Sequence, residues 1–285
     1  ASVLQLVNPT EGGAQVRASE RGVVSQTIDG TVFTIDYARP RVRGRDGLFG
    51  RVVTWGEVWT PGANWATTLE VTRDVRIDGH QVPKGKYSVW MIVGPQEWTV
   101  VLDPRNKRYH TETPDSTAEQ VRWVVRPQEG AFTESLTWSF PEVTPGGTQL
   151  LFQWETKRVV LNARVTPKHP LTIARAEVEP YLGRYRWSFV EDTSTKMMME
   201  LYYENGSLKA RYEPDPDFYR AMQRSIMARI NDDWFIPALM KNGEIWEMVA
   251  DMVFEFDVKN GKATGFEIRD DRDILLGSGK RVESP

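Results

Sequence analysis

The 285-residue chain contains no cysteine and only three histidines, and these absences exclude several kinds of chemistry. Without cysteine the chain has no disulfide, no thiolate nucleophile, no zinc finger and no cysteine-ligated iron–sulfur cluster. His80, His110 and His169 match neither H-x-H nor H-E-x-x-H spacing. The acidic turns match no calcium-loop pattern. We therefore expect no metal and no cofactor.

Motifs for nucleophiles and phosphates are also missing. No serine lies in a G-x-S-x-G elbow or begins S-x-x-K, and neither G-x-G-x-x-G nor a Walker A sequence occurs. The net charge of −3 divides into +2 for residues 1–170 (20 Lys/Arg, 18 Asp/Glu) and −5 for residues 171–285 (16 and 21). This balance disfavours a nucleic-acid binder. No window approaches 18 uncharged apolar residues, so we expect no transmembrane helix.

The first half of the chain has a strongly alternating β pattern. Residues 31–37 (TVFTIDY) alternate with period two, and their β-branched and aromatic residues suit a pleated sheet. The dipeptides Asp29-Gly30 and Asp78-Gly79 supply the backbone conformations that tight hairpins need. We expect an N-terminal extension over residues 1–21 and an antiparallel β-sandwich over 22–166. Comparable alternating runs occur at 67–77, 86–93, 97–102, 120–126, 134–140, 148–155 and 157–165.

The strand pattern is interrupted at residues 166–170, where two prolines stand close together, and we predict a linker over 167–177. Strands resume afterwards and are joined by the turns Asn205-Gly206, Asn242-Gly243 and Asn260-Gly261. This pattern predicts a small up-and-down antiparallel β-barrel over residues 178–285. The later runs lie at 183–190, 196–203, 207–212 and 265–269.

One segment of the second half breaks the β pattern. Its apolar residues recur every four positions, with Asp215 as an N-cap and proline at the first helical position. We expect one short amphipathic helix here, whose apolar stripe packs on its own domain. The stripe consists of Phe218, Met222, Ile226 and Ile230.

Four arginines spaced by two precede the first loop. In an extended segment they would share one face and offer a cationic row to a phosphate, sulfate or carboxylated partner. Pro40 and Gly44 favour an irregular segment instead, in which the arginines pair internally or face solvent. These residues are Arg39, Arg41, Arg43 and Arg45.

Four motifs in order give the first half a family resemblance: residues 37–45 (YARPRVRGR), 56–68 (GEVWTPGANWATT), 85–88 (GKYS) and 97–100 (EWTV). Residues 22–166 resemble the bacterial family called domain of unknown function 2911. The resemblance implies a β-rich domain of exported proteins without a settled activity. Residues 178–282, beginning at 179–185 (EPYLGRY), are similar to the small β-barrel appended to some β-lactamase-related proteins.

The chain departs from the first family's pattern at two loop positions. The family commonly has arginine after Trp59, where this chain has Thr60, and a polar or acidic residue where it has Trp65. Without the arginine, the chain lacks a guanidinium group that could bind an anion through two hydrogen bonds. The added tryptophan is of a residue type that is enriched at protein interfaces. We therefore interpret Trp59, Asn64 and Trp65 as a contact surface. Alternatively, these three residues pin the loop.

We interpret the chain as a non-enzymatic binding protein, an accessory or structural subunit that contacts a protein partner. A small ligand inside the C-terminal barrel is a second prediction. The competing hypothesis is a hydrolase that uses Glu57 with Tyr37 or His80 near the loop 56–68. A further hypothesis is a non-catalytic carbohydrate-binding site at the same loop. Because the chain begins with Ala1, we expect a removed signal peptide and a periplasmic or secreted protein, with methionine excision as the alternative.

Overall fold

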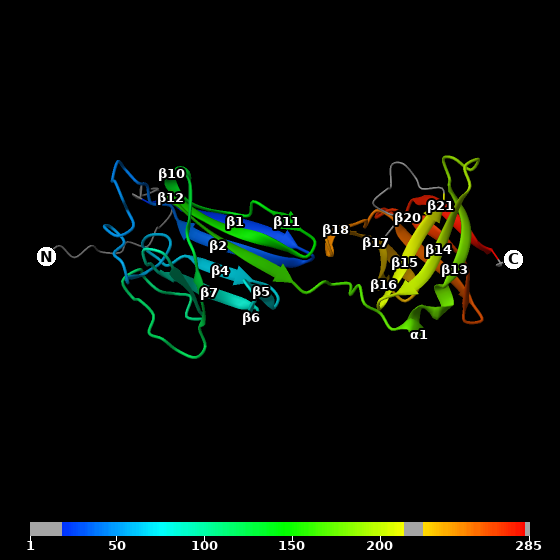
Figure 1. Ribbon diagram of the computed structural model, residues 1–285, viewed down its shortest axis with the longest axis horizontal. Coiled ribbons are helices and arrows are strands. Elements are labelled where there is room, and N and C mark those ends of the chain that lie inside the picture. The colour runs from blue at the N-terminus through cyan, green and yellow to red at the C-terminus, as the bar shows by residue number, and fades with distance from the viewer. Residues whose placement is uncertain (1–18, 214–224, 283–285) are drawn as a thin grey trace, which may run out of the picture. The chain divides into compact units, whose positions relative to one another are not determined.

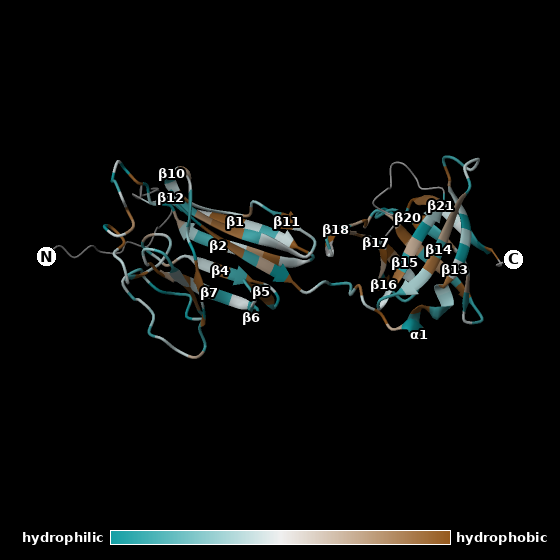
Figure 2. Cartoon of the chain, viewed as in Figure 1, coloured by the Kyte–Doolittle hydropathy of each residue, from teal (hydrophilic) through white to brown (hydrophobic). Residues whose placement is uncertain are grey.

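The computed structural model describes residues 19–213 and 225–282, whose regular secondary structure is almost entirely β-strand. The chain divides into two compact units, the first made mainly of residues up to 164 and the second of residues from 165 onward (Figure 1). Polar and apolar residues alternate along the strands of both units (Figure 2). One face of each strand therefore enters a core, as the period-two pattern predicts.

The first unit is a sandwich of two antiparallel sheets, as expected from the sequence. Within the described residues the larger sheet has seven strands in the order β1-β2-β4-β7-β8-β9, with β3 beside β7, and the smaller has five in the order β10-β12-β5-β6, with β11 beside β12. The larger sheet comprises β1 (Arg21–Ile28), β2 (Thr31–Ala38), β3 (Val58–Trp59), β4 (Thr68–Val71), β7 (Gly85–Ile92), β8 (Trp98–Asp103) and β9 (Val121–Val125). The smaller comprises β5 (Val75–Ile77), β6 (His80–Val82), β10 (Gln128–Ser139), β11 (Val143–Thr144) and β12 (Gly147–Val165).

The sandwich core lies between the two sheets and is rich in aromatic rings. Trp98 of β8 lies against Phe152 of β12, with ring centroids 6.1 Å apart. Phe33 and Trp138, which lie in opposite sheets, each expose at most 2 % of their surface to solvent. A smaller cluster, Ala66 with Trp90 and Val101, lies on the other face of the larger sheet. That second cluster supports the loops that carry the candidate site.

The second unit is a closed antiparallel barrel of eight strands among the residues described, because β16 pairs with both β15 and β17. A further strand, β18, pairs with β17 outside the closed ring. The ring comprises β13 (Gly183–Phe189), β14 (Met197–Glu204), β15 (Ser207–Glu213), β16 (Ile226–Asn231), β17 (Trp234–Lys241), β19 (Val253–Lys259), β20 (Lys262–Arg269) and β21 (Leu275–Val282); β18 is Glu244–Met248.

The barrel interior is packed with large side chains. Tyr185, Phe235 and Phe254 are completely buried there and belong to one continuous apolar cluster. Phe256 lies 5.4 Å from Phe266, measured between ring centroids. Small eight-stranded barrels are just wide enough for side chains to fill them. The ligand expected inside the barrel stays a prediction, and this aromatic filling weighs against it.

Among the described residues the helical elements are α1 (Arg175–Val178) and the 3₁₀ turn η1 (Glu179–Tyr181), which precede the barrel strands. Residues 214–224, which include Phe218 and Met222 of the expected helical stripe, lie outside the described residues. Ile226 and Ile230 correct that expectation, because both belong to strand β16. Pairing of β16 with β17 closes the barrel and outweighs the local four-residue period.

Candidate functional site

A concave pocket of about 470 Å³ lies on the outer face of the larger sheet and is the candidate site. Its volume is in the range of about 300–1,000 Å³ that small-molecule sites occupy. Neighbouring strands β1, β2, β4 and β7 form its floor, and the loops around residues 65 and 107 form its walls. Its lining residues are Arg21, Asp36, Trp65, Ala66, Thr68, Lys86, Asn106, Lys107 and Arg108.

Trp65 is held at the pocket by two backbone hydrogen bonds that join its loop to the loop opposite. The N–H of Ala66 donates to the carbonyl of Arg108 at 2.9 Å, and the N–H of His110 donates to the carbonyl of Asn64 at 2.7 Å. The indole packs perpendicular to the ring of Tyr109, with centroids 5.5 Å apart. Trp65 nevertheless keeps 45 % of its surface exposed. It is therefore a rigidly placed aromatic side chain that remains available for contact.

The backbone of Asn64 sets the direction of Trp65, because it has a φ of 62°, in the left-handed region. Asparagine tolerates this region, whereas a β-branched residue does not. We expect Asn64→Val to destabilise the first unit by about 1–2 kcal/mol, and Asn64→Gly to cost less. Thermal unfolding of both variants measures this, and equal losses would show that the left-handed backbone is not the cause.

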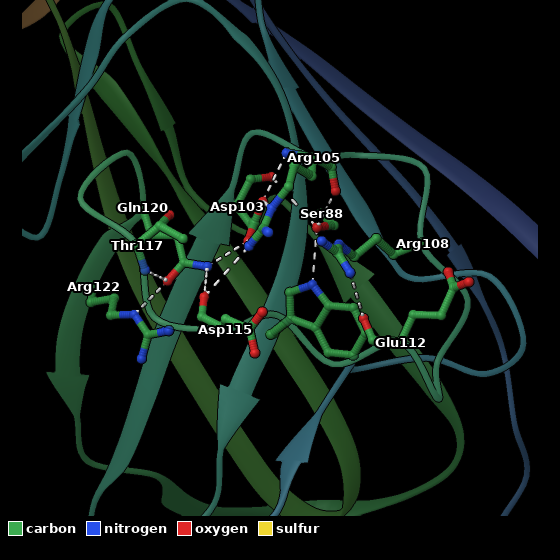
Figure 3. A network of polar contacts seen from close by, with 10 residues as sticks. Ser88, Asp103, Arg105, Arg108, Glu112, Asp115, Thr117, Gln120 and Arg122 are labelled. Carbon is green, nitrogen blue, oxygen red and sulfur yellow. Dashed lines mark hydrogen bonds and ion pairs between the residues drawn. The ribbon is translucent and has the colours of Figure 1, made fainter.

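A buried polar network fixes the loop that carries Lys107 and Arg108 (Figure 3). The carboxylate of Asp103, which has no solvent exposure, accepts hydrogen bonds from the backbone and guanidinium of Arg105 and from the Gln120 amide. Ser88 donates to the Arg105 carbonyl at 2.9 Å and accepts from the Trp90 indole. Both ends of this loop are therefore attached to the sheet.

Burial disfavours the ionised form of Asp103, but the hydrogen bonds from Arg105 and Gln120 outweigh it and lower the pKa of the carboxyl to about 2. Asp103 is therefore a carboxylate at neutral pH. Its charge is matched by Arg105, which lies 2.6 Å away. The network has the character of a structural anchor, because Asp103, Arg105 and Gln120 hydrogen-bond to one another and none of them lines the pocket.

The pocket itself carries excess positive charge. Arg21 pairs with Asp36 at 2.8 Å, and Lys86 lies 3.6 Å from Glu70. In the part of the chain that the structure describes, Lys107 forms no ion pair or hydrogen bond. Arg108 forms no ion pair there, and its guanidinium donates one hydrogen bond, to the backbone carbonyl of Glu112. Two cationic groups thus remain without a carboxylate partner.

Trp59, predicted at the contact surface, is half-buried and packs against aromatic residues of the sandwich core. Its ring stacks on Trp154 with centroids 5.9 Å apart and an interplanar angle of 12°, and packs edge-on against Phe152. The alternative reading, in which the residue pins its loop, describes this contact. Of the three loop residues, Trp65 lines the pocket, Asn64 shapes its turn, and the half-buried Trp59 packs against the core.

The arginine row follows the irregular path that Pro40 and Gly44 favoured. Arg39 donates to the Leu136 carbonyl, and the guanidinium of Arg45 donates to the carbonyls of Val42 and Arg41. Arg41 lies 3.4 Å from Glu134, whose carboxylate also accepts from the Arg43 backbone N–H. These contacts hold the segment on β10, and the row does not line the pocket.

The three candidate catalytic residues have separate partners. Tyr37 is buried and donates to the Trp138 carbonyl, while the Glu57 carboxylate accepts from the backbone and hydroxyl of Thr54 at 2.8 Å. The ring of His80 stacks on Trp123. No direct hydrogen bond joins any two of the three in the described chain. The catalytic grouping stays a prediction, without a contact that assembles it.

Sequence reasoning missed all five charged residues of the pocket lining, namely Arg21, Asp36, Lys86, Lys107 and Arg108. One local signal was present, because residues 105–108 (RNKR) place three cations directly after an apolar strand. Arg21 and Lys86 carried no such signal, since each is a single charge on a strand surface. Only strand pairing brings them beside Trp65.

The described residues 19–213 and 225–282 lack two further kinds of feature. No group of three or more histidine, aspartate or glutamate side chains there is arranged to hold a metal ion. No described helix combines the length and apolar character needed to cross a membrane.

These features define a two-unit, all-β protein with a cationic, tryptophan-lined pocket on its sandwich unit. The chain belongs to the family described as "Protein of unknown function (DUF2911)", whose model matches residues 19–163, just over half of its length. That match confirms the first resemblance. No curated protein and no solved structure matches the chain significantly. The likeness of the barrel to β-lactamase-related proteins stays a prediction.

Proposed function

We propose that this protein is a non-enzymatic binding protein, an accessory or structural subunit whose first unit contacts a protein partner at Trp65 and the adjoining pocket. The observation that carries the proposal is a 45 % exposed tryptophan on a backbone fixed at both sides. Rigid, partly exposed tryptophans are the side chains that most often dominate interface energies. Ordering such a group on binding costs little conformational entropy.

Binding is favoured over the two alternatives by particular contacts. The hydrogen bonds of Tyr37 and Glu57 are made within the fold, and His80 lies on Trp123, so no acid–base pair is formed. A carbohydrate platform requires coplanar exposed rings, whereas the rings of Trp65 and its neighbour Tyr109 are at 87°. As part of the proposal we place the protein in the periplasm or outside the cell, in line with the exported proteins of the family it resembles.

The first test is purification of the full chain from its host, followed by size-exclusion chromatography and mass spectrometry of the proteins that co-elute. We expect a defined partner at fixed stoichiometry. We expect Trp65→Ala to weaken that association by about 2 kcal/mol, roughly 30-fold, the usual effect of truncating a central aromatic residue of an interface.

Trp55→Ala is the matched control, since Trp55 is equally exposed at 45 % and belongs to the same unit but does not line the pocket. It should leave the association within twofold of the wild type. A chain that elutes alone at its monomer mass, or equal losses for the two variants, would contradict the proposal.

A further inference from the structure

We infer that the group recognised by the Trp65 pocket is an anion, a carboxylate or phosphate attached to a flat apolar moiety. This inference rests on the proposed function, in which the pocket is a binding site. It adds a statement of which chemical group of the partner binds in the pocket.

The charges around the pocket support an anionic occupant. The lining contains four cations, Arg21, Lys86, Lys107 and Arg108, and one carboxylate, Asp36. Asp36 is paired with Arg21, and Glu70 at the rim is paired with Lys86. Counting four positive and these two negative charges leaves a net charge of +2. A ligand without charge would leave that excess uncompensated in a concave site, where screening by water is reduced.

The two cations without a carboxylate partner are adjacent in sequence and lie on the wall next to Trp65. Arg108 accepts the Ala66 N–H through its own carbonyl, so its backbone is directly attached to the tryptophan loop. Its guanidinium carries five N–H donors, of which one is used, toward the Glu112 carbonyl. Lys107 adds a mobile ammonium group with three donors. Together they can hold the oxygens of one anionic group.

Trp65 supplies the second half of the recognition. Its exposed surface borders the same concavity as Lys107 and Arg108. An anion held by those cations would therefore present whatever it is attached to against the indole. A flat apolar moiety gains from that contact through burial of its surface and through ring–ring interaction. The pocket thus selects for both parts of the ligand.

The nearest carboxylate on the same loop does not cancel this charge. The Glu112 carboxylate accepts the backbone N–H of Tyr109 at 2.8 Å, which orients it toward the turn. Among the described residues no ion pair joins Glu112 to Lys107 or Arg108. The two cations therefore remain available for an incoming group.

The test measures binding of three small probes to the full-length protein labelled with 5-fluorotryptophan. The ¹⁹F resonance of Trp65 is assigned by its loss in Trp65→Phe. Benzoate and benzamide have the same flat shape and differ in charge, and phenyl phosphate carries close to two negative charges at pH 7.5. We expect benzoate to shift the Trp65 signal at about one tenth of the concentration needed for benzamide. Phenyl phosphate should act at still lower concentration, because the net charge is +2.

The double variant Lys107→Gln/Arg108→Gln tests the origin of the selectivity. It should reduce the preference for benzoate over benzamide from about tenfold to below twofold. The control is Arg73→Gln/Lys84→Gln, which removes the same charge from exposed positions outside the lining. It should keep the preference. Thermal unfolding establishes that both variants are folded.

Each outcome decides the inference. A preference for phenyl phosphate identifies a phosphate-bearing ligand, and equal binding of phenyl phosphate and benzoate identifies a carboxylate. Equal binding of benzoate and benzamide overturns the anionic preference but leaves the pocket as a binding site. If no probe shifts Trp65, the inference fails, while the co-elution of a partner that depends on Trp65 still decides the proposed function.

Discussion

Replacing Asp103 with alanine is expected to destabilise the first unit by about 3 kcal/mol, because it removes a buried carboxylate and leaves the donors around it unpaired. The variant leaves the backbone N–H of Arg105 and the Gln120 amide without their shared acceptor. In a unit of this size the loss corresponds to a fall of about 6–12 °C in melting temperature. Differential scanning calorimetry of the full chain measures it.

Asp115→Ala is the control for Asp103→Ala. Asp115 takes part in the same network only through its backbone carbonyl, which accepts from Arg105 and Gln120, and its residue is exposed. We expect a change within about 0.5 kcal/mol, as for surface substitutions in general. If both variants lose the same stability, the Asp103 carboxylate is not the anchor of the loop.

The network also makes the first unit acid-sensitive in a defined range. The pKa of Asp103 in the folded protein is about 2, below the value of about 3.9 for an unfolded chain. The ionised form therefore adds stability that is fully present above about pH 4 and is lost as the pH falls through 2. The wild type should lose about 2 kcal/mol more than Asp103→Asn over that interval. Parallel denaturant titrations at pH 2 and pH 5 test this.

Replacing Gly279 with valine is expected to destabilise the barrel by about 2–3 kcal/mol through overpacking. A Cβ atom at this position would lie 2.5 Å from the Phe266 ring and 2.9 Å from the Cβ of Trp187. Gly279 is the backbone partner of both residues, in strands β20 and β13. Its lack of a side chain makes room for the two rings. Valine has a high preference for strands, so a loss would come from packing rather than from propensity.

Two further variants separate packing from other effects in β21. Ser278→Val changes the adjacent, solvent-facing residue of the same strand and should alter stability by less than about 0.5 kcal/mol. Gly279→Val combined with Phe266→Leu should lose less than the sum of the single variants, because the smaller side chain relieves the contact. Urea unfolding followed by circular dichroism measures these two proteins beside the wild type, Gly279→Val and Phe266→Leu. Additive losses would contradict a clash between residues 279 and 266.

The conformations of the hairpin turns could be predicted from local sequence alone. Five Asp-Gly or Asn-Gly pairs were expected to form tight turns, and in all five both residues have positive φ values. They begin at Asp29, Asp78, Asn205, Asn242 and Asn260. These turns need no distant contact, because the required backbone conformation is a property of the two residues themselves.

The extent of the strands depended more on the tertiary structure. The runs predicted at 148–155 and 157–165 are a single strand, β12, of 19 residues. The register between β12 and β10 shifts on both sides of the pair formed by Glu155 and Thr133, and Glu155 has a φ of 55°. The same Glu155 carboxylate accepts hydrogen bonds from the backbone of Gly47 and Leu48, more than 100 residues earlier in the chain. No local pattern reports a contact at that separation.

In the candidate site, too, some residues could be predicted from local sequence, while the placement of others depends on distant contacts. Trp65 could be predicted because an added tryptophan in a loop is a local signal. The packing of Trp59, six residues earlier, depends on Trp154 across the sandwich. The internal pairing of the arginine segment depends equally on β10, since Arg39 reaches the carbonyl of Leu136, 97 residues away.

The amino-acid sequence by itself determined the all-β class, the tight turns, the two-part organisation and the absence of thiol chemistry. All of these follow from composition and from patterns within a few residues. The tertiary structure alone decided which aromatic side chains are buried, which charges are paired, and that Lys107 and Arg108 lie beside Trp65. The physical reason is that burial and charge pairing are set by neighbours in space. In a sandwich and a closed barrel, most of those neighbours come from distant parts of the chain.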